Sequence, residues 1–246
     1  MPFTPAHPLI LYPLRFLPVK YFSVTALIIG SIVPDMEYFL KLNAAAVFSH
    51  SVKGIFLFNL PVTILIAWLW HSGVKNALIY IPLLKDKYYR IQDVSFRKLF
   101  TSAPAVFLIS ALIGITSHIV LDGFTHPRGY FARRSPFLLD FVSVAGMKLR
   151  MCYLLWYIAS IAGTAIVLVN LIDFKKFRAI FRMTDEGKNF WLQTLFLAAV
   201  LSIIRIAGGL SWNTYRHLVI IAIGSGLYAF FTIALITKKK KSIVDQ

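Results

Sequence analysis

The sequence predicts an all-α protein: a polytopic helical membrane protein with about five transmembrane helices and a short N-terminal half-helix. Hydrophobic residues make up 58% of its 246 residues and charged residues only 15%, and the mean hydropathy is +0.72. Soluble domains carry about 45–50% apolar and about 25% charged residues. A soluble fold of this size has too little interior to bury so much apolar surface. This composition therefore excludes a disordered chain and argues strongly against a soluble globule.

Five segments are apolar over the roughly 20 residues that a helix needs to cross a hydrocarbon core. They are 54–71, 102–121, 151–172, 190–210 and 218–237. The stretch 21–33 is too short to span and predicts a half-helix before Pro34, which we expect to open a new helix. The proline-rich segment before it should be extended or kinked. Because that segment lacks a basic region and a small-residue cleavage pattern, we expect it to stay in the mature protein.

The charge is strongly basic, with 26 Lys and Arg against 10 Asp and Glu. In a membrane protein this balance favours basic cytoplasmic loops over nucleic-acid binding. More than half of the basic residues fall in 72–101, 173–189 and the tail Lys238–Lys241. We therefore expect these three regions on the cytoplasmic side of the membrane. Residues 1–130 should form one half with the half-helix and the first two spans, and 131–246 a basic loop with three further spans, within one integrated domain.

The alternation of spans brings several histidines and acids to one membrane face. If 54–71 begins on the outer side, then 102–121 must end there. The residues expected at that face are His7, Asp35, Glu37, His50, His118, Asp122 and His126. His71 ends its span at the opposite face, after Trp68 and Trp70, and is typical of an interfacial anchor.

The strongest local pattern is the spacing of His118, Asp122 and His126. On a helix each step of four residues turns by only about 40°, so the three side chains form one stripe. Imidazole and carboxylate groups together are ligands for zinc or a similar divalent metal. The alternative is that a histidine and an aspartate only hydrogen-bond within the bundle, although ionisable groups at membrane depth are usually functional.

Three further residues are candidates for the same site. Asp35 follows Pro34 directly, so we expect it at the start of a helix, at the membrane face where the histidines gather. The alternative to a ligand role is that its charge only stabilises the helix terminus. Asp35 and Glu37 are also the candidates for the catalytic base. His7 lies between Pro5 and Pro8, and this rigidity suits a ligand.

Three arginines are candidates for substrate binding. Arg133 and Arg134 closely follow the histidine stripe, and paired guanidinium groups suit phosphate; snorkelling toward lipid headgroups is the alternative. Arg205 lies inside the span 190–210, where it needs an acid such as Asp140, a substrate phosphate or a wet cavity.

These motifs resemble a bacterial membrane-protein family of unknown function. They are Met1-Pro2-Phe3-Thr4-Pro5-Ala6-His7-Pro8, Gly30-Ser31-Ile32-Val33-Pro34-Asp35, Ser49-His50 and Ser117-His118-x3-Asp122-x3-His126. That family looks related to metal-dependent hydrolases of the inner membrane. More distantly, the ligand order is similar to that of zinc-dependent phospholipase C.

The resemblance covers about the first 130 residues and implies a set of metal ligands. Ligand positions fall on His7, Asp35, His50, His118 and Asp122, with a weaker counterpart for His126. The phospholipase carries a further His-x3-Glu pair that this sequence lacks, so one or two metal ions fit better than three.

The sequence therefore predicts a membrane-embedded, metal-dependent hydrolase with zinc or another divalent metal as cofactor. We expect it to act on a phosphate ester of a lipid or lipid-linked substrate, with membrane lipids as partners, no nucleic acid, and the metal site on the outer face. The alternatives are a transporter that binds a metal as cargo and a non-catalytic structural membrane protein.

Overall fold

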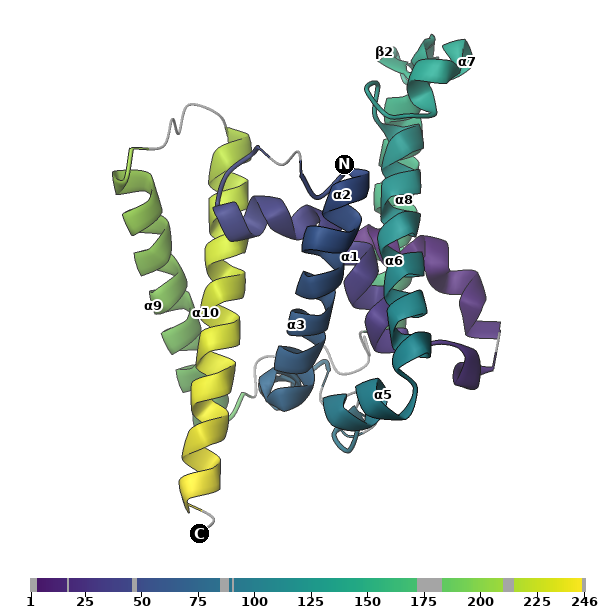
Figure 1. Ribbon diagram of the computed structural model, residues 1–246. Helices are drawn as coiled ribbons and strands as arrows, with labels where there is room; N and C mark the ends of the chain where they lie inside the picture. The colour runs from purple at the N-terminus through teal and green to yellow at the C-terminus, as the bar shows by residue number, and fades with distance from the viewer. Residues whose placement is uncertain are drawn as a thin grey trace. The chain divides into compact units, whose positions relative to one another are not determined.

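The computed structural model describes residues 4–16, 18–45, 48–84, 89, 91–171, 183–209 and 215–244. These residues are mostly helical, with one short β-hairpin (Figure 1). Five of their helical segments are long and apolar enough to cross a membrane: Val52–Ser72, Pro104–Thr125, Met151–Asn170, Asp185–Ala207 and Tyr215–Thr237. Each segment matches one predicted span to within a few residues. The expectation of an all-α, polytopic membrane protein is confirmed.

Contacts divide the chain into two interleaved units. The first contains Met1–Pro34, Ser49–Ile64 and Ala103–Asn170; the second contains Asp35–Phe48, Leu65–Ser102 and Leu171–Gln246. Helices α1 (Val24–Lys41) and α3 (Leu60–Ser72) each run from one unit into the other. The expected functional division near residue 130 stays a prediction.

The proline-rich N-terminal segment is helical where the sequence suggested an extended or kinked chain. It forms the 3-10 helix η1 (Thr4–Phe16), followed by the short 3-10 helix η2 (Val19–Tyr21). Proline fixes φ near −65°, which lies within the 3-10 range, so Pro8 and Pro13 are compatible with this helix. Helix α8 (Met151–Leu171) contacts η1 at Gly163, where an added Cβ would lie 2.6 Å from the Ala6 Cβ.

Helix α1 continues through Pro34, so the prediction that a new helix begins there is wrong. An interior proline removes one backbone hydrogen bond. Packing against neighbouring helices and side-chain hydrogen bonds make such prolines tolerable in membrane helices. Here the Ser31 hydroxyl donates to the Ile28 carbonyl, 2.8 Å away, one turn before the proline. The helix ends before Leu42, whose φ is +47°.

Two glycines let α1 cross α6 (Pro104–Thr125) at very short range. A Cβ added at Gly114 would lie 2.4 Å from the Leu27 carbonyl oxygen and 2.9 Å from the Ser31 nitrogen. On the opposite helix, a Cβ at Gly30 would lie 2.6 Å from the Ala111 carbonyl oxygen. Small residues at such crossings are typical of helix pairs in membranes.

Between α6 and α8 the chain forms a compact connection. It contains the 3-10 turn η5 (Ala132–Arg134), the short helix α7 (Pro136–Leu139) and a hairpin of β1 (Phe141–Val144) and β2 (Met147–Arg150). The strands pair antiparallel, with Phe141 opposite Arg150 and Val144 opposite Met147. Ala145 and Gly146 have φ values of 49° and 80°, which fit a type I′ turn.

The first candidate span is built from three consecutive helical pieces. They are α2 (Val52–Gly54), the π-helical turn η3 (Ile55–Asn59) and α3. Ser51 caps the N-terminus of α2, because its hydroxyl accepts a hydrogen bond from the Gly54 N–H at 3.0 Å.

In the second unit, α9 (Asp185–Ala207) and α10 (Tyr215–Val244) pack side by side (Figure 1). Their apolar core includes the 3-10 helix η4 (Val74–Tyr80). The Tyr80 and Phe190 rings stack with centroids 4.8 Å apart. The short helix α5 (Phe96–Ser102) follows in the same unit.

Lys75 is only 4% exposed, although it belongs to the basic stretch 72–101. Its ammonium group donates to the carbonyl oxygens of Ile91 at 3.0 Å and Gln92 at 2.6 Å, and also to that of Val94. Three carbonyl acceptors satisfy the three N–H groups of a lysine. Lys75 therefore anchors the segment after η4 and contributes little to the charge of the loop surface.

Replacing Gly114 by alanine should lower the apparent Tm of the protein in detergent, whereas Gly226→Ala should leave it unchanged or raise it. Both changes gain about 1 kcal/mol of helix propensity. Only the first forces a methyl group against the backbone of α1, and such overpacking costs about 1–3 kcal/mol; Gly226 has open space around its Cβ position. Equal stabilisation by both variants would contradict the close helix crossing.

Candidate metal centre

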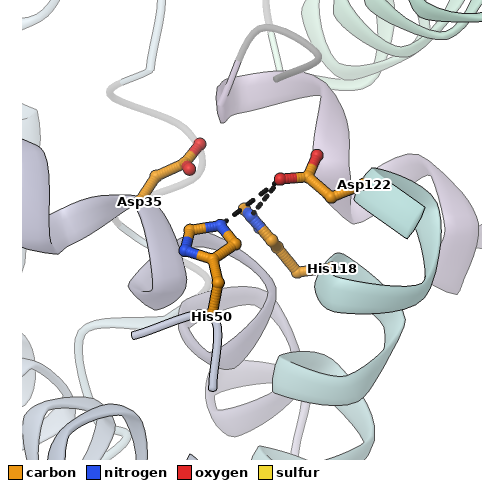
Figure 2. Close-up of side chains that lie close together, drawn as sticks. All are labelled: Asp35, His50, His118 and Asp122. Atoms are coloured by element: carbon orange, nitrogen blue, oxygen red, sulfur yellow. Dashed lines mark ion pairs between the residues drawn. The ribbon is translucent and has the colours of Figure 1, made fainter. Parts of the chain in front are cut away.

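Four side chains of the described residues converge on one point: Asp35, His50, His118 and Asp122 (Figure 2). Each offers one ligand atom, and these atoms lie within 4.8 Å of one another. Asp35 comes from α1, His50 from the turn before α2, and the other two from α6. Asp35 is the first residue of the second unit, but α1 is continuous across this boundary, so the helix itself carries the carboxylate into the group.

Asp122 is the centre of the group. Its Oδ2 lies 3.3 Å from His50 Nε2 and 3.7 Å from His118 Nε2. Its Oδ1 lies 3.7 Å from His126 Nδ1 and 3.9 Å from His7 Nε2. The carboxylate thus has imidazole nitrogens beside both oxygens, which is the mixed donor set that the sequence pattern predicted.

A backbone carbonyl fixes the tautomer of His118. Its Nδ1 lies 2.7 Å from the Ser31 carbonyl oxygen, which can only accept, so Nδ1 carries a proton and donates it. The neutral ring then presents a lone pair at Nε2, toward Asp122. A proton or a metal cation between these two electron-rich atoms would stabilise the arrangement. A carbonyl on the far nitrogen is the usual support of a metal-ligating histidine.

His7 packs flat against His118. The two rings are stacked with centroids 3.6 Å apart and an interplanar angle of 10°, and both side chains are fully buried. Two positively charged rings in this position would repel each other, and burial disfavours the charged form of each. A divalent cation would balance the buried Asp35 and Asp122 without charging the stacked rings.

Asn59 holds the turn that carries His50, and the sequence analysis did not single it out. Its side-chain NH₂ donates to the Ser49 carbonyl at 2.7 Å, and the Ser49 hydroxyl lies 2.9 Å from His50 Nδ1. Asn59 ends the π-helical turn η3, and such turns are frequent at functional sites. A fully buried asparagine inside an apolar span is the feature that could have revealed it.

Two predicted site residues, His126 and Glu37, do not belong to this group of four ligands. His126 lies just after α6, and its Nδ1 is 3.1 Å from the Asp122 backbone carbonyl oxygen, so this nitrogen donates rather than ligates. Burial lowers the pKa of His126, an effect that the Asp122 carboxylate opposes. Glu37 is turned about 200° from Asp35 around α1, and its carboxylate lies 2.5 Å from Lys41 Nζ.

The residues that converge fit a divalent metal. Two imidazole nitrogens and two carboxylate oxygens are a donor set that zinc accepts and that other first-row divalent metals share. The carboxylates are buried, and a buried charge is costly unless it is paired or binds a metal. The described part of the chain therefore contains a cluster that could bind a metal ion, whereas metal binding itself and the identity and number of the ions stay predictions.

A sequence profile of the domain of unknown function DUF4184 matches residues 1–238. The chain belongs to this family. No curated protein and no solved structure shows significant similarity to it. The DUF4184 match covers the whole cluster and all five spans, and it confirms the expected membership in a family of unknown function. The relationships to hydrolases and to phospholipase C stay predictions.

The candidate substrate arginines lie outside the cluster. Arg134 stacks over the Tyr130 ring, 3.7 Å from its centroid, and donates to the Tyr130 carbonyl at 3.1 Å. It lines a pocket of about 390 Å³ together with Phe124, Phe131, Ser135, Phe137 and Leu138. Phe124 is turned about 200° from Asp122 around α6, so this pocket opens on another side of that helix. Arg133 is exposed on η5.

Arg205, in α9 of the second unit, has a backbone partner. Its Nε donates to the Leu42 carbonyl at 3.4 Å. This contact supplies part of the pairing for which the sequence suggested Asp140 or a substrate phosphate. A role of Arg205 in substrate binding stays a prediction.

Purified protein should hold about one or two equivalents of zinc or a related divalent metal, and alanine at His118 or Asp122 should lower this content strongly. Both residues supply donors that converge in the cluster, and removing one ligand weakens binding. The matched control is His71→Ala, because His71 Nδ1 lies 3.0 Å from the Val94 carbonyl oxygen in the second unit. The measurement is elemental analysis after purification. Equal metal in all variants would contradict the assignment.

Proposed function

We propose that this protein is a membrane-embedded, metal-dependent hydrolase that cleaves a phosphate ester of a lipid or lipid-linked substrate. The observation that supports this most is the group of Asp35, His50, His118 and Asp122, with ligand atoms within 4.8 Å of one another at the end of a candidate membrane span. Metal binding alone does not specify a reaction. The depth of the cluster in the membrane span and the nearby arginines support the proposed substrate class.

The depth of the cluster favours a headgroup substrate. Asp122 lies three residues before the end of the span Pro104–Thr125, which is roughly 5 Å along a helix axis. The site therefore belongs at the level where the hydrocarbon core gives way to polar headgroups. Phosphate esters are the most abundant anions at that level, and acyl chains can reach such a site laterally from the bilayer.

In this proposal the cluster residues hold the metal and the substrate phosphate, and the arginines balance the remaining charge. His50, His118 and Asp122 would hold a divalent metal, which would supply Lewis-acid catalysis at the phosphoryl oxygen and at water. Water adds to phosphorus, the ester P–O bond breaks, and the proton of the water reaches the leaving alcohol. Asp35 would ligate the metal or accept that proton, whereas the Glu37 carboxylate is ion-paired with Lys41.

Arg133 and Arg134 carry guanidinium groups that suit binding of an anionic substrate. A guanidinium carries five N–H donors, and Arg134 uses one of them on the Tyr130 carbonyl. The apolar pocket beside Arg134 has the character of an acyl-chain site next to an anion-binding group. Because the pocket opens on another side of α6 from the cluster, these residues are proposed to hold the acyl chain and to add positive charge near the lipid phosphate.

Purified, metal-loaded protein in detergent should hydrolyse phospholipids or polyprenyl phosphates, with loss of activity on chelation and recovery on adding zinc. Asp122→Ala should abolish turnover, because it removes the central ligand. Arg133→Ala combined with Arg134→Ala should raise KM or lower kcat while the metal content stays that of the wild type. If the loaded protein cleaves none of these lipids but moves a metal ion across liposomes, transport replaces hydrolysis as its function.

We further propose that the protein lies in a bacterial cytoplasmic membrane with the cluster on the outer face. In intact cells, an impermeant thiol reagent should label Arg128→Cys and not Asp86→Cys, in a Cys152→Ser background. Arg128 lies three residues after the end of α6 and is exposed, whereas position 86 belongs to the basic stretch 72–101 of the sequence. Labelling after permeabilisation controls for reactivity, and the reverse pattern would invert the orientation.

A further inference from the structure

The hairpin of β1 and β2 has one apolar face and one basic face. Directly opposed residues of an antiparallel pair lie on the same face of the sheet, and successive residues alternate. The pairs Val142–Leu149 and Val144–Met147 therefore share one face. The pairs Phe141–Arg150 and Ser143–Lys148 share the other, where the Arg150 guanidinium lies 5.6 Å from the Phe141 ring centroid.

The tip of the apolar face is exposed in the structure. Met147 is 65% and Val144 is 37% exposed, whereas Val142 and Leu149 nearer the helices are half-buried. A two-stranded hairpin with solvent on both faces is at best marginally stable in water. The hairpin would gain stability from an apolar medium that covers Val144 and Met147.

The connection to the helices places the hairpin at a membrane face. It lies between the candidate spans Pro104–Thr125 and Met151–Asn170, and β2 leads into α8 without an intervening residue. In Figure 1 both β2 and α7 lie beyond the same ends of α6 and α8. Helices that span a bilayer end at its interface, so the hairpin lies within reach of the headgroups.

The basic charge of the connection between α6 and α8 favours anionic lipids. The segment 126–150 contains one acidic residue, Asp140, and five basic residues: Arg128, Arg133, Arg134, Lys148 and Arg150. Two of these cations lie on the basic face of the hairpin itself. Basic residues at the membrane surface attract anionic lipids, and long basic side chains can lie along apolar surface while their charges reach the headgroups.

We propose that the β1–β2 hairpin is an interfacial lipid-binding element. Val144 and Met147 insert between the lipids, and Lys148 and Arg150 bind the phosphates of anionic phospholipids. This assignment rests on the hairpin and the spans beside it, so it holds whether or not the metal cluster catalyses hydrolysis.

The first test measures insertion by fluorescence. Single cysteines at 147 and at 143, each in a Cys152→Ser background, are labelled with an environment-sensitive nitrobenzoxadiazole dye. The full-length protein is placed in nanodiscs of phosphatidylcholine and phosphatidylglycerol, where both membrane faces are open to solvent. The label at 147 should be blue-shifted and quenched by doxyl-labelled lipid, and the label at 143, on the opposite face, should be quenched more strongly by aqueous iodide.

Two results would overturn the proposal. Equal iodide quenching at 147 and 143 would show that the apolar face does not insert. A label at 147 that neither iodide nor doxyl lipid reaches would show that protein, such as a second copy of the chain, covers this face. Both positions are exposed, so labelling should leave the fold intact; matching metal content and Tm check this.

The second test addresses the headgroup charge. With the label at 147, doxyl-phosphatidylglycerol should quench several-fold more strongly than doxyl-phosphatidylcholine. The double variant Lys148→Gln with Arg150→Gln should lose most of this preference, and high salt should weaken it in the wild type. Lys98→Gln with Lys188→Gln, which removes two exposed lysines of the second unit, is the matched control. An unchanged preference in the hairpin variant would contradict the proposed headgroup contact.

Discussion

The close crossing of α1 and α6 is the constraint on which the candidate centre depends. Gly30 and Gly114 bring the two backbones to a separation that a single methyl group would prevent. One turn after Gly114, His118 donates from Nδ1 to the Ser31 carbonyl, which directly follows Gly30. The same contact that packs the helices therefore sets the tautomer of His118 and turns its Nε2 toward Asp122. Packing and ligand chemistry are coupled through a few backbone atoms, because membrane helices associate through close contact rather than through the hydrophobic effect.

Charge balance explains why imidazole and carboxylate groups are gathered at this depth. Asp35 and Asp122 are buried, and a buried carboxylate is stable only when it is paired or coordinates a cation. The histidines around them are held by neutral contacts: a backbone carbonyl for His118, the Ser49 hydroxyl for His50 and the stacked His118 ring for His7. Imidazole nitrogens beside carboxylate oxygens would offer a divalent cation nitrogen and oxygen donors together.

The supports of the centre come from parts of the chain that carry no metal-binding motif. Gly163 of α8 admits Ala6 and thereby fixes η1, which carries His7. Asn59, at the end of the π-helical turn, holds the Ser49 carbonyl and with it the turn that carries His50. No metal-binding motif marks Gly163 or Asn59, because the glycine acts through close packing and the asparagine through a hydrogen bond to the backbone. DUF4184 spans all of these elements, so the support and the ligands belong to the same family unit.

The sequence by itself determined the membrane class and the five spans, because apolar length follows from composition and order alone. It also predicted a larger set of candidate ligands at one membrane face, and the tertiary structure brings Asp35, His50, His118 and Asp122 together from that set. Only the tertiary structure decided that α1 runs through Pro34, that Glu37 pairs with Lys41, and that His126 Nδ1 donates to a backbone carbonyl. Those outcomes depend on which face of a helix meets a neighbour and on which backbone group lies within hydrogen-bond distance. Such facts arise from contacts between residues far apart in the chain, and a linear pattern does not contain them.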